Sequence, residues 1–307
     1  MANPVKRDVH IDAILSNVSV KYGNGEAIAD IVFPRVKVKK ESDKYFTYTR
    51  NFRIPKSYRA IGSESEGIDW EISTDSYFCE EYALHDDVFD RLRKNADAPL
   101  NLDVDTSEVL TDALILTREK RIADIAFSET YVTNSSALSG SDQWSDYAGS
   151  DPLGDFEDRM LSVQGACGKL PNLIVLGAEV MSKLRNHPDL LERIKYVQKG
   201  IVTEDLLSSL LPGGPRVVVG NLMYDSSQEG GDESLGYIWG KYALIAYVEQ
   251  SPGIKKISLG YQFFHQDREV AKWREDKIRG DRIEVTEVSD EKLVAASCGY
   301  LLRTVVA

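Results

Sequence analysis

Cys79, His85 and the neighbouring acids Asp86 and Asp87 are the residue types that a thiol–imidazole–carboxylate nucleophile requires. Such groups normally converge from distant segments of a fold. Here they lie in one strand-like stretch that contains no recognisable nucleophile turn. We therefore interpret Cys79 as a packing residue and His85 as a surface residue, and we expect no catalytic residues. A soluble α/β enzyme that uses Cys79 or the acid-rich segment stays as an alternative.

Two further stretches resemble ligand-binding motifs without meeting their requirements. The segment 165–170 looks like a phosphate loop, but no Ser or Thr follows Lys169, and the segment follows a helix rather than a strand. We read it as the end of a helix. The run 103–108 is rich in oxygen ligands but does not fit the twelve-residue calcium loop, so helix capping is the better interpretation.

The histidines and cysteines show no pairing typical of a metal site. The four histidines are His10, His85, His187 and His265. The three cysteines are Cys79, Cys167 and Cys298. Their wide spacing and odd number predict reduced thiols of a cytoplasmic fold rather than a disulfide framework. With no glycine-rich dinucleotide motif either, the sequence predicts neither a metal nor a cofactor.

The composition is that of a globular protein. The chain has 307 residues, of which 42% are hydrophobic and 28% charged, enough for a sizeable core and more than one lobe. It contains no apolar run long enough to cross a bilayer, and its start lacks the apolar core of a signal peptide, so we expect no membrane partner. The net charge of −12 argues against general nucleic-acid binding.

The charges are divided into two blocks. Residues 35–59 hold nine basic residues and two acids, whereas residues 61–90 hold ten acids and neither Lys nor Arg. One interpretation is a pair of solvated faces on a single molecule. The other is a projecting arm that docks on an oppositely charged surface of a neighbouring copy.

Strand patterns flank this region. Residues 36–39 alternate apolar with basic side chains, and residues 68–72 alternate apolar with acidic ones, which predicts a long antiparallel excursion. A lone two-stranded ribbon has little core of its own, so something must cover it. We expect the apolar faces of Val36, Val38, Trp70 and Ile72 to meet a neighbour. The predicted interface residues are Lys37, Lys39, Lys40, Lys44, Arg50, Arg53, Glu64, Glu66, Asp69, Trp70 and Glu71.

A long helix is predicted over 105–128. Asp105 is a suitable N-cap with Glu108 three residues later, and apolar residues then recur at helical spacing. A second helix is predicted from Asp151–Pro152 to Gly168, because Pro favours the first turn and Gly the end. Thr203 is expected to cap a short helix.

Strands follow on both sides of these helices. Apolar runs at 172–176 and 216–219 suggest a compact α/β lobe between Asp151 and Asn221. Later strands are predicted at 237–248, 256–265, 282–288 and 299–306, and 269–277 is ambiguous.

Segments spread along the chain resemble the major capsid proteins of tailed bacteriophages, which adopt the Hong Kong phage-type fold. The resemblance extends to about Phe264 and is specific only collectively. The segments that carry it are Ile28–Pro34, Ser42–Phe46, Thr74–Tyr82, Asn95–Leu100, Gln143–Tyr147, Pro171–Gly177, His187–Asp189, Gly200–Leu207 and Tyr237–Lys241.

The resemblance implies an α+β layout. Residues 1–34 would form an N-terminal arm and residues 35–75 an extended loop. Residues 76–150 and 249–307 would form a peripheral domain with 105–128 as its spine helix, and the last strands would return to its sheet. Residues 151–248 would form an axial domain.

The resemblance also implies a function. Such subunits assemble as hexamers and pentamers, in the host cytoplasm, into the icosahedral capsid of a virion that packages double-stranded DNA without sequence-specific binding. The short lead before the arm favours a separate scaffolding protein, or none, and portal and decoration proteins are further expected partners. The rival within the same fold is an encapsulin-type nanocompartment that encloses an enzyme cargo.

Overall fold

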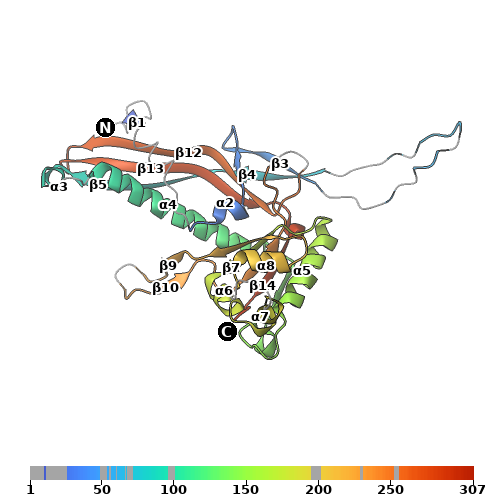
Figure 1. Ribbon diagram of the computed structural model, residues 1–307. Helices are drawn as coiled ribbons and strands as arrows, with labels where there is room; N and C mark the ends of the chain where they lie inside the picture. Colours follow the sequence, from blue (N-terminus) through green and yellow to red (C-terminus); the bar gives the residue numbers. More distant parts are fainter. Residues whose placement is uncertain are drawn as a thin grey trace.

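The computed structural model describes residues 10–11, 26–48, 54, 57–59, 61–65, 67, 72–95, 101–194, 202–228, 231–251 and 256–307. Within these ranges two five-stranded sheets and two two-stranded ribbons are formed. Figure 1 shows the first sheet, which we call the blade sheet, extending to one side above a helix-covered lobe that contains the second, the lobe sheet. The α+β class predicted from the sequence is confirmed.

The blade sheet is built around one long hairpin. β12 (Gly260–Glu275) pairs with β13 (Gly280–Leu293), and β5 (Glu80–Phe89) pairs antiparallel with the other side of β13. Two short strands, β1 (His10–Ile11) and β2 (Arg35–Lys37), pair with β12. The stretch 269–275 that the sequence left ambiguous is therefore the second half of a strand.

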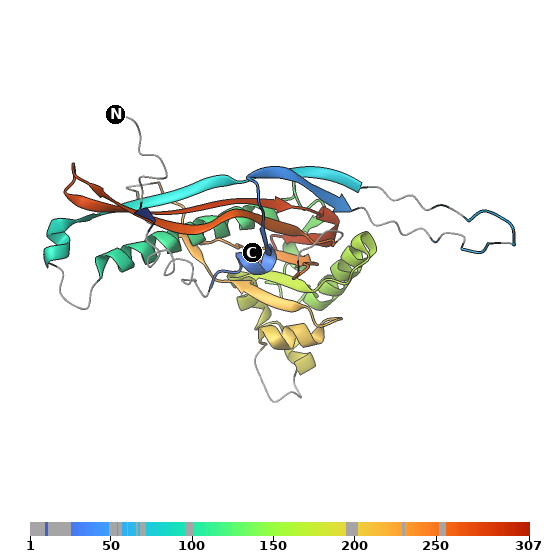
Figure 2. The same ribbon diagram turned by 90° about the horizontal axis from the view of Figure 1, so that it is seen from above.

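A single helix, α4 (Leu102–Ala126), lies along one face of the blade sheet (Figures 1 and 2). Leu110 and Leu114 of this helix pack against Ile283 and Val285 of β13. These side chains recur at helical spacing on one partner and alternate on the other, which is how a helix and a sheet each present an apolar face.

The predicted bounds of this helix, 105–128, are wrong at both ends. The helix begins at Leu102 and ends at Ala126, with Asn101 in the N-cap position. Leu102 and Val104 pack against the blade-sheet core, and this contact adds a turn before Asp105. Asp105 lies inside the first turn, where its negative charge interacts favourably with the positive end of the helix dipole.

The lobe sheet has the order β6-β14-β11-β7-β8. Its strands are β6 (Ser135–Ala137), β14 (Gly299–Arg303), β11 (Ala243–Ala246), β7 (Leu173–Gly177) and β8 (Arg216–Gly220). Its helices are α5 (Pro152–Cys167), α6 (Ala178–Leu184), α7 (Pro188–Ile194) and α8 (Glu204–Leu210). The helices and the two strands predicted between Asp151 and Asn221 lie in this lobe, but the other three strands of its sheet come from outside that range.

The capping residues predicted from the sequence are confirmed for two of these helices, α5 and α8. Asp151 accepts a hydrogen bond from the Gly154 backbone N–H at the start of α5, and Gly168 ends that helix with φ 67°. Thr203 Oγ1 accepts from the Leu206 N–H at the start of α8. The segment 165–170 is thus a helix end, as predicted.

One strand lies in a different sheet from the one expected. The resemblance implies that the strand at 299–306 returns to the sheet of the peripheral domain, but β14 pairs with β11 and β6 in the lobe sheet. Leu301 and Leu302 are buried in two different cores, one on each face. A central strand covered on both faces gains more from burial than one at a half-exposed sheet.

The end of α4 joins the two halves of the molecule. Ile122 and Ala126 of α4 share a core with Leu173 and Val175 of β7 and with Leu301 of β14. No helix in the described ranges has the length and apolar character needed to cross a bilayer.

The remaining elements are short. Two ribbons pair β3 (Ser42–Tyr48) with β4 (Ile72–Phe78) and β9 (Met223–Asp225) with β10 (Leu235–Tyr237). The short helices are α2 (Ala29–Val32), α3 (Asp90–Asn95), η1 (Gly140–Asp142) and η2 (Ala296–Cys298).

Candidate assembly interface

An antiparallel ribbon is present, but β3 and β4 form it rather than the predicted strands. Residues 35–37 belong to β2 of the blade sheet, and residues 68–71 lie outside the described residues. Ser42 lies opposite Phe78, and Tyr48 lies opposite Ile72. The Tyr45 hydroxyl donates a 2.9 Å hydrogen bond to Asp75 across the ribbon. The pairing is therefore continuous along the base of the extended loop, from Ser42 to Tyr48 on one strand and from Ile72 to Phe78 on the other.

The base of the ribbon is anchored to the blade sheet by aromatic packing. Tyr77 stacks on Phe263 with ring centroids 4.7 Å apart, and Tyr45 contacts the same ring at 5.2 Å. Val36 and Val38 pack against this cluster. Both valines are thus only partly buried against their own chain, and their expected contact with a neighbouring copy stays a prediction.

Beyond the base, large apolar side chains are left in solvent. Ile54 is 95% exposed, Tyr58 90% and Ile61 109%. Figure 1 shows the described residues between 57 and 65, in blue, far from both sheets. Burying one such aliphatic side chain is worth about 1.5–3 kcal/mol. The described part of this loop therefore leaves an apolar surface unburied within its own chain.

Four of the six predicted basic residues of the interface are described, and they lie at or near the base of the ribbon. Lys37, Lys39, Lys40 and Lys44 are all exposed. Two of them have weak partners within the chain: Lys37 lies 3.3 Å from Asp267, and Lys40 lies 3.1 Å from Asp43. Ion pairs this exposed contribute little, so the charges remain available to another surface.

The acidic half of the prediction falls mostly outside the described residues. Glu64 is described and exposed. The predicted residues outside the described ranges are Arg50, Arg53, Glu66, Asp69, Trp70 and Glu71.

The structure divides the acids of β5 into two groups. Asp87 accepts two hydrogen bonds from Arg282, which lower the pKa of that carboxyl. Glu80, Glu81 and Asp86 are exposed along β5, the terminal strand of the blade sheet. The sequence shows the acidic block, but only the fold shows which of its members are neutralised within the chain.

The thiol alternative does not form a catalytic group. Cys79 is 4% exposed, its Sγ lies 3.5 Å from the Phe263 carbonyl oxygen, and burial raises the pKa of the thiol to about 11. His85 is exposed on β5, six residues along an extended chain, or about 20 Å away at the rise of a strand. The thiol therefore stays protonated at neutral pH and has no imidazole partner in His85.

Other suspected ligands have structural roles. Asp103 forms ion pairs with Arg93 and Lys272, each at 2.6 Å. Across the described residues, no three His, Cys, Asp or Glu side chains gather as a metal site.

A buried carboxylate that the sequence did not single out joins three segments. Glu119 of α4 accepts hydrogen bonds from the backbone N–H groups of Ile28 and Ala29 at 3.0 and 2.9 Å, and from the Trp239 indole at 2.7 Å. Burial raises the pKa of this carboxyl. The only sequence signal was indirect, since Ile28–Pro34 and Tyr237–Lys241 were both among the family-like segments.

Comparison with known proteins relates the chain to phages. The protein named "Major capsid protein" of Burkholderia phage BcepMu is 29% identical over 301 residues, which cover 95% of each chain. The protein of the same name from Pseudomonas phage JBD67 is 28% identical and covers 97% of each. No protein-family model matches the chain.

Solved structures agree on the fold. The crystal structure of a phage-related protein from Bordetella bronchiseptica has a TM-score of 0.79 and 23% identity, and the match covers 97% of this chain and 98% of that one. An encapsulin complex from Synechococcus elongatus has a TM-score of 0.54 and 11% identity, covering 100% and 94% of the two chains, a likeness of fold alone. The chain is thus a homologue of phage major capsid proteins and has the Hong Kong phage-type capsid fold.

Proposed function

We propose that the protein is the shell-building subunit of a phage head, which self-assembles as hexamers and pentamers into an icosahedral shell around double-stranded DNA. The observation that carries the proposal is the extended loop, which leaves Ile54, Tyr58 and Ile61 at least 90% exposed. In an isolated subunit these side chains contribute no burial free energy. In an assembly, neighbouring copies that cover the loop bury them, and each such contact is stabilised.

The proposed interface combines these apolar side chains with opposed charge. Lys37, Lys39, Lys40 and Lys44 lie at the root of the ribbon, and Glu80, Glu81 and Asp86 line the acidic margin of β5. Each exposed ion pair contributes about 0–1 kcal/mol. Repetition around a closed shell makes such small contributions add up, because each bound copy holds the next at high effective concentration.

The parts of the chain take proposed roles in this assembly. Residues 1–34 act as the N-terminal arm and residues 35–75 as the extended loop. Residues 76–150 and 249–307 supply the peripheral domain, and 151–248 the axial domain. β6 and β14 pair within the lobe sheet, so the axial domain draws on both flanking segments.

The proposed function depends on how copies of the chain fit together and not on a catalysed reaction. The proposed shell encloses packaged DNA without sequence-specific binding, in keeping with the net charge of −12. It is assembled in the host cytoplasm and remains in the virion, with portal, decoration and scaffolding proteins as further partners.

Size-exclusion chromatography followed by electron microscopy of the purified chain tests the proposal. Closed shells support it. A monomer or dimer under assembly-promoting buffer contradicts it, and a shell that co-purifies with an enzyme cargo instead of DNA assigns the chain to nanocompartments.

The electrostatic part of the interface has its own test. The triple variant Lys37→Glu, Lys39→Glu, Lys40→Glu is expected to reduce shell yield and to change its salt dependence. The matched control is the Lys→Arg triple variant, which keeps the charge and should assemble normally. Unchanged yield and salt response in the Glu variant would rule out the charge contribution and leave the apolar one.

A further inference from the structure

The far end of the blade sheet is held by a compact network of ion pairs. Its members are Asp90, Arg93, Asp103, Lys272, Arg274 and Asp281. Arg274 binds both oxygens of Asp90 at 2.6 Å, and Arg93 bridges Asp103 at 2.6 Å and Asp281 at 2.8 Å. The network fixes α3 against the turn between β12 and β13, so this tip is a rigid platform.

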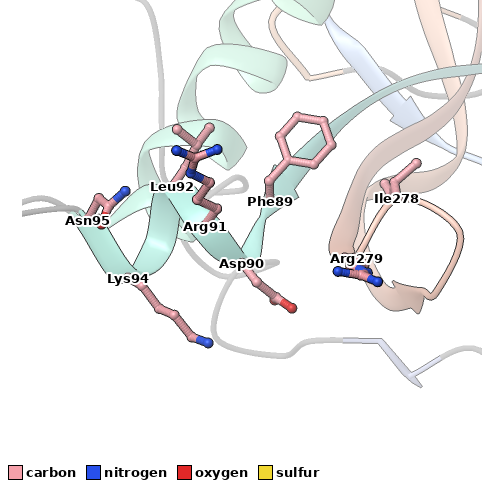
Figure 3. Close-up of a pocket in the computed structure, with 8 residues that line it drawn as sticks. All are labelled: Phe89, Asp90, Arg91, Leu92, Lys94, Asn95, Ile278 and Arg279. Carbon is pink, nitrogen blue, oxygen red and sulfur yellow. The ribbon is translucent and has the colours of Figure 1, made fainter.

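A notch of about 870 Å³ opens between α3 and that turn (Figure 3). Its apolar lining comes from Phe89, Leu92 and Ile278. Phe89 is 42% exposed and Leu92 56% exposed. The notch therefore offers a small apolar contact area that suits a single aliphatic side chain.

Three cations surround the notch. Arg91 and Lys94 come from α3, and Arg279 comes from the β12–β13 turn (Figure 3). None of the three side chains forms an ion pair or hydrogen bond with the described part of the chain. Asp90 also lines the notch, but Arg274 already neutralises it, and that contact lowers the pKa of the carboxyl. A basic, partly apolar notch on a chain of net charge −12 favours an acidic, partly apolar occupant.

The end of the β9–β10 loop and the first residue of β10 display that combination. Asp232 and Glu233 are exposed, and Leu235 is 61% exposed. Asp225 holds the two ends of the β9–β10 loop together. Its side chain accepts hydrogen bonds from the backbone N–H groups of Ser227 and Ser234 at 2.9 Å each. Figure 1 shows β9 and β10 projecting from the lobe below α4, on the same side of the molecule as the tip of the blade sheet but separate from it. The ribbon is thus presented outward and does not fill the notch of its own chain.

We propose that the β9–β10 ribbon of one copy seats in the tip notch of a second copy. Leu235 packs on Phe89 and Leu92, while Asp232 and Glu233 face the three cations. The inference rests on the proposed function for the presence of closely packed copies. Nucleic acid fits less well, since phosphate binding makes no use of an exposed Phe and Leu and three cations neutralise few phosphates.

Charge exchange tests the contact. Arg91→Glu with Lys94→Glu, and separately Asp232→Lys with Glu233→Lys, are each expected to lower shell yield at least tenfold. Combining the four substitutions should restore most of the yield. The matched control, Arg91→Lys with Lys94→Arg, should assemble like the wild type. Far-ultraviolet circular dichroism of unassembled protein confirms that each variant is folded.

A covalent readout is independent of yield. The three native cysteines are buried, so a 1:1 mixture of Leu92→Cys and Leu235→Cys copies, oxidised with copper phenanthroline, should give a dimer band on a non-reducing gel. Neither variant alone should give it at comparable yield. Absence of the mixed dimer in shells that assemble like the wild type overturns the proposal. A quadruple charge variant whose shell yield is no higher than that of either double variant also overturns it.

The outcomes separate the two proposals. If wild-type chains form no shells, the proposed function fails. If shells form and all charge variants assemble equally, only the ribbon-to-notch contact fails. Loss of packaged DNA from the Arg91 and Lys94 variant with normal shell yield assigns the notch to nucleic acid and also overturns the contact.

Discussion

The indole N–H of Trp239 donates a 2.7 Å hydrogen bond to the buried carboxylate of Glu119. The same carboxylate receives the backbone N–H groups at the start of α2. Gly220 lies so close to the indole that a Cβ at this position would come within 2.1 Å of it. One side chain of the long helix thus fixes an N-terminal element and the edge of the lobe sheet together.

Replacing Glu119 by Gln should destabilise the fold. An amide oxygen can keep the bonds from Ile28 and Trp239, but its NH₂ group faces the Ala29 N–H, which is left unsatisfied. We expect the free energy of unfolding to fall by about 1–3 kcal/mol, measured by urea denaturation. Trp239→Phe, which removes one donor and leaves the carboxylate, is the comparison. Equal stability of Glu119→Gln and wild type would contradict the role of this joint.

The pH dependence of that difference has a defined sign. Burial raises the pKa of Glu119 above its ordinary value of 4.5, so the folded state holds the proton more tightly than the unfolded state. The stability that this protonation supplies is fully present below pH 4.5 and is lost as the pH rises through the folded pKa. Relative to Glu119→Gln, wild-type stability should therefore fall across that window in denaturation series at several pH values.

His187 should make the lobe sensitive to mild acid. The ring is fully buried and lies 3.0 Å from the Ser150 hydroxyl, and burial lowers its pKa from 6.5 despite the nearby Asp189 and Asp151. A lowered pKa contributes stability above pH 6.5 that is lost as the pH falls through the folded value. Thermal melts between pH 8 and 5 should show a larger loss for wild type than for His187→Gln. Parallel curves would exclude His187 as the cause.

A buried ion pair between helix and sheet should be costly to break. Arg118 and Glu287 are 3% and 1% exposed and lie 3.4 Å apart. Arg118→Met leaves a buried carboxylate with fewer partners, and we expect a loss of about 3–5 kcal/mol in unfolding free energy. Adding Glu287→Leu should recover part of that loss. Arg185→Met, at the exposed position that follows α6, is the control, with an expected change within about 0.5 kcal/mol.

The exposed apolar residues of the extended loop should matter for assembly and not for subunit stability. Ile54→Ser, Tyr58→Ser and Ile61→Ser remove side chains that have almost no contacts within the chain. The unassembled subunit should keep its melting temperature, whereas the yield of shells in electron micrographs should drop. Leu161→Ser, at a 64% exposed position on α5, is the matched control. A lowered melting temperature of the loop variant would show that these residues pack within the subunit.

Sequence reasoning worked where the signal is local. The Asp151–Pro152 start and the Gly168 end of α5 are set by residues next to the helix, and both were predicted. The start of α4 was missed because Leu102 and Val104 extend the helix through contacts with a distant sheet. The sheet that contains β14 depends on pairing with strands more than 50 residues away, which no local pattern encodes.

The candidate interface shows the same division. The two charge blocks are evident in the sequence, and so is a segment too thin to have its own core. The residues that pair with these charges and pack on this segment are not evident in the sequence. Asp87 and Asp90 are neutralised by Arg282 and Arg274, residues nearly 200 positions away, and Val36 and Val38 are packed against Phe263.

The length of the β12–β13 hairpin determines how far the tip of the blade sheet lies from the body of the molecule. β12 has 16 residues, so at about 3.3 Å per residue it measures roughly 50 Å from the body to the tip. Adding two residues to each strand would advance the tip by about 7 Å while every side chain kept its face, whereas adding one would turn the apolar face outward. If neighbouring copies meet at this tip, as the ribbon-to-notch contact proposes, the residue count of the hairpin sets the distance between their centres.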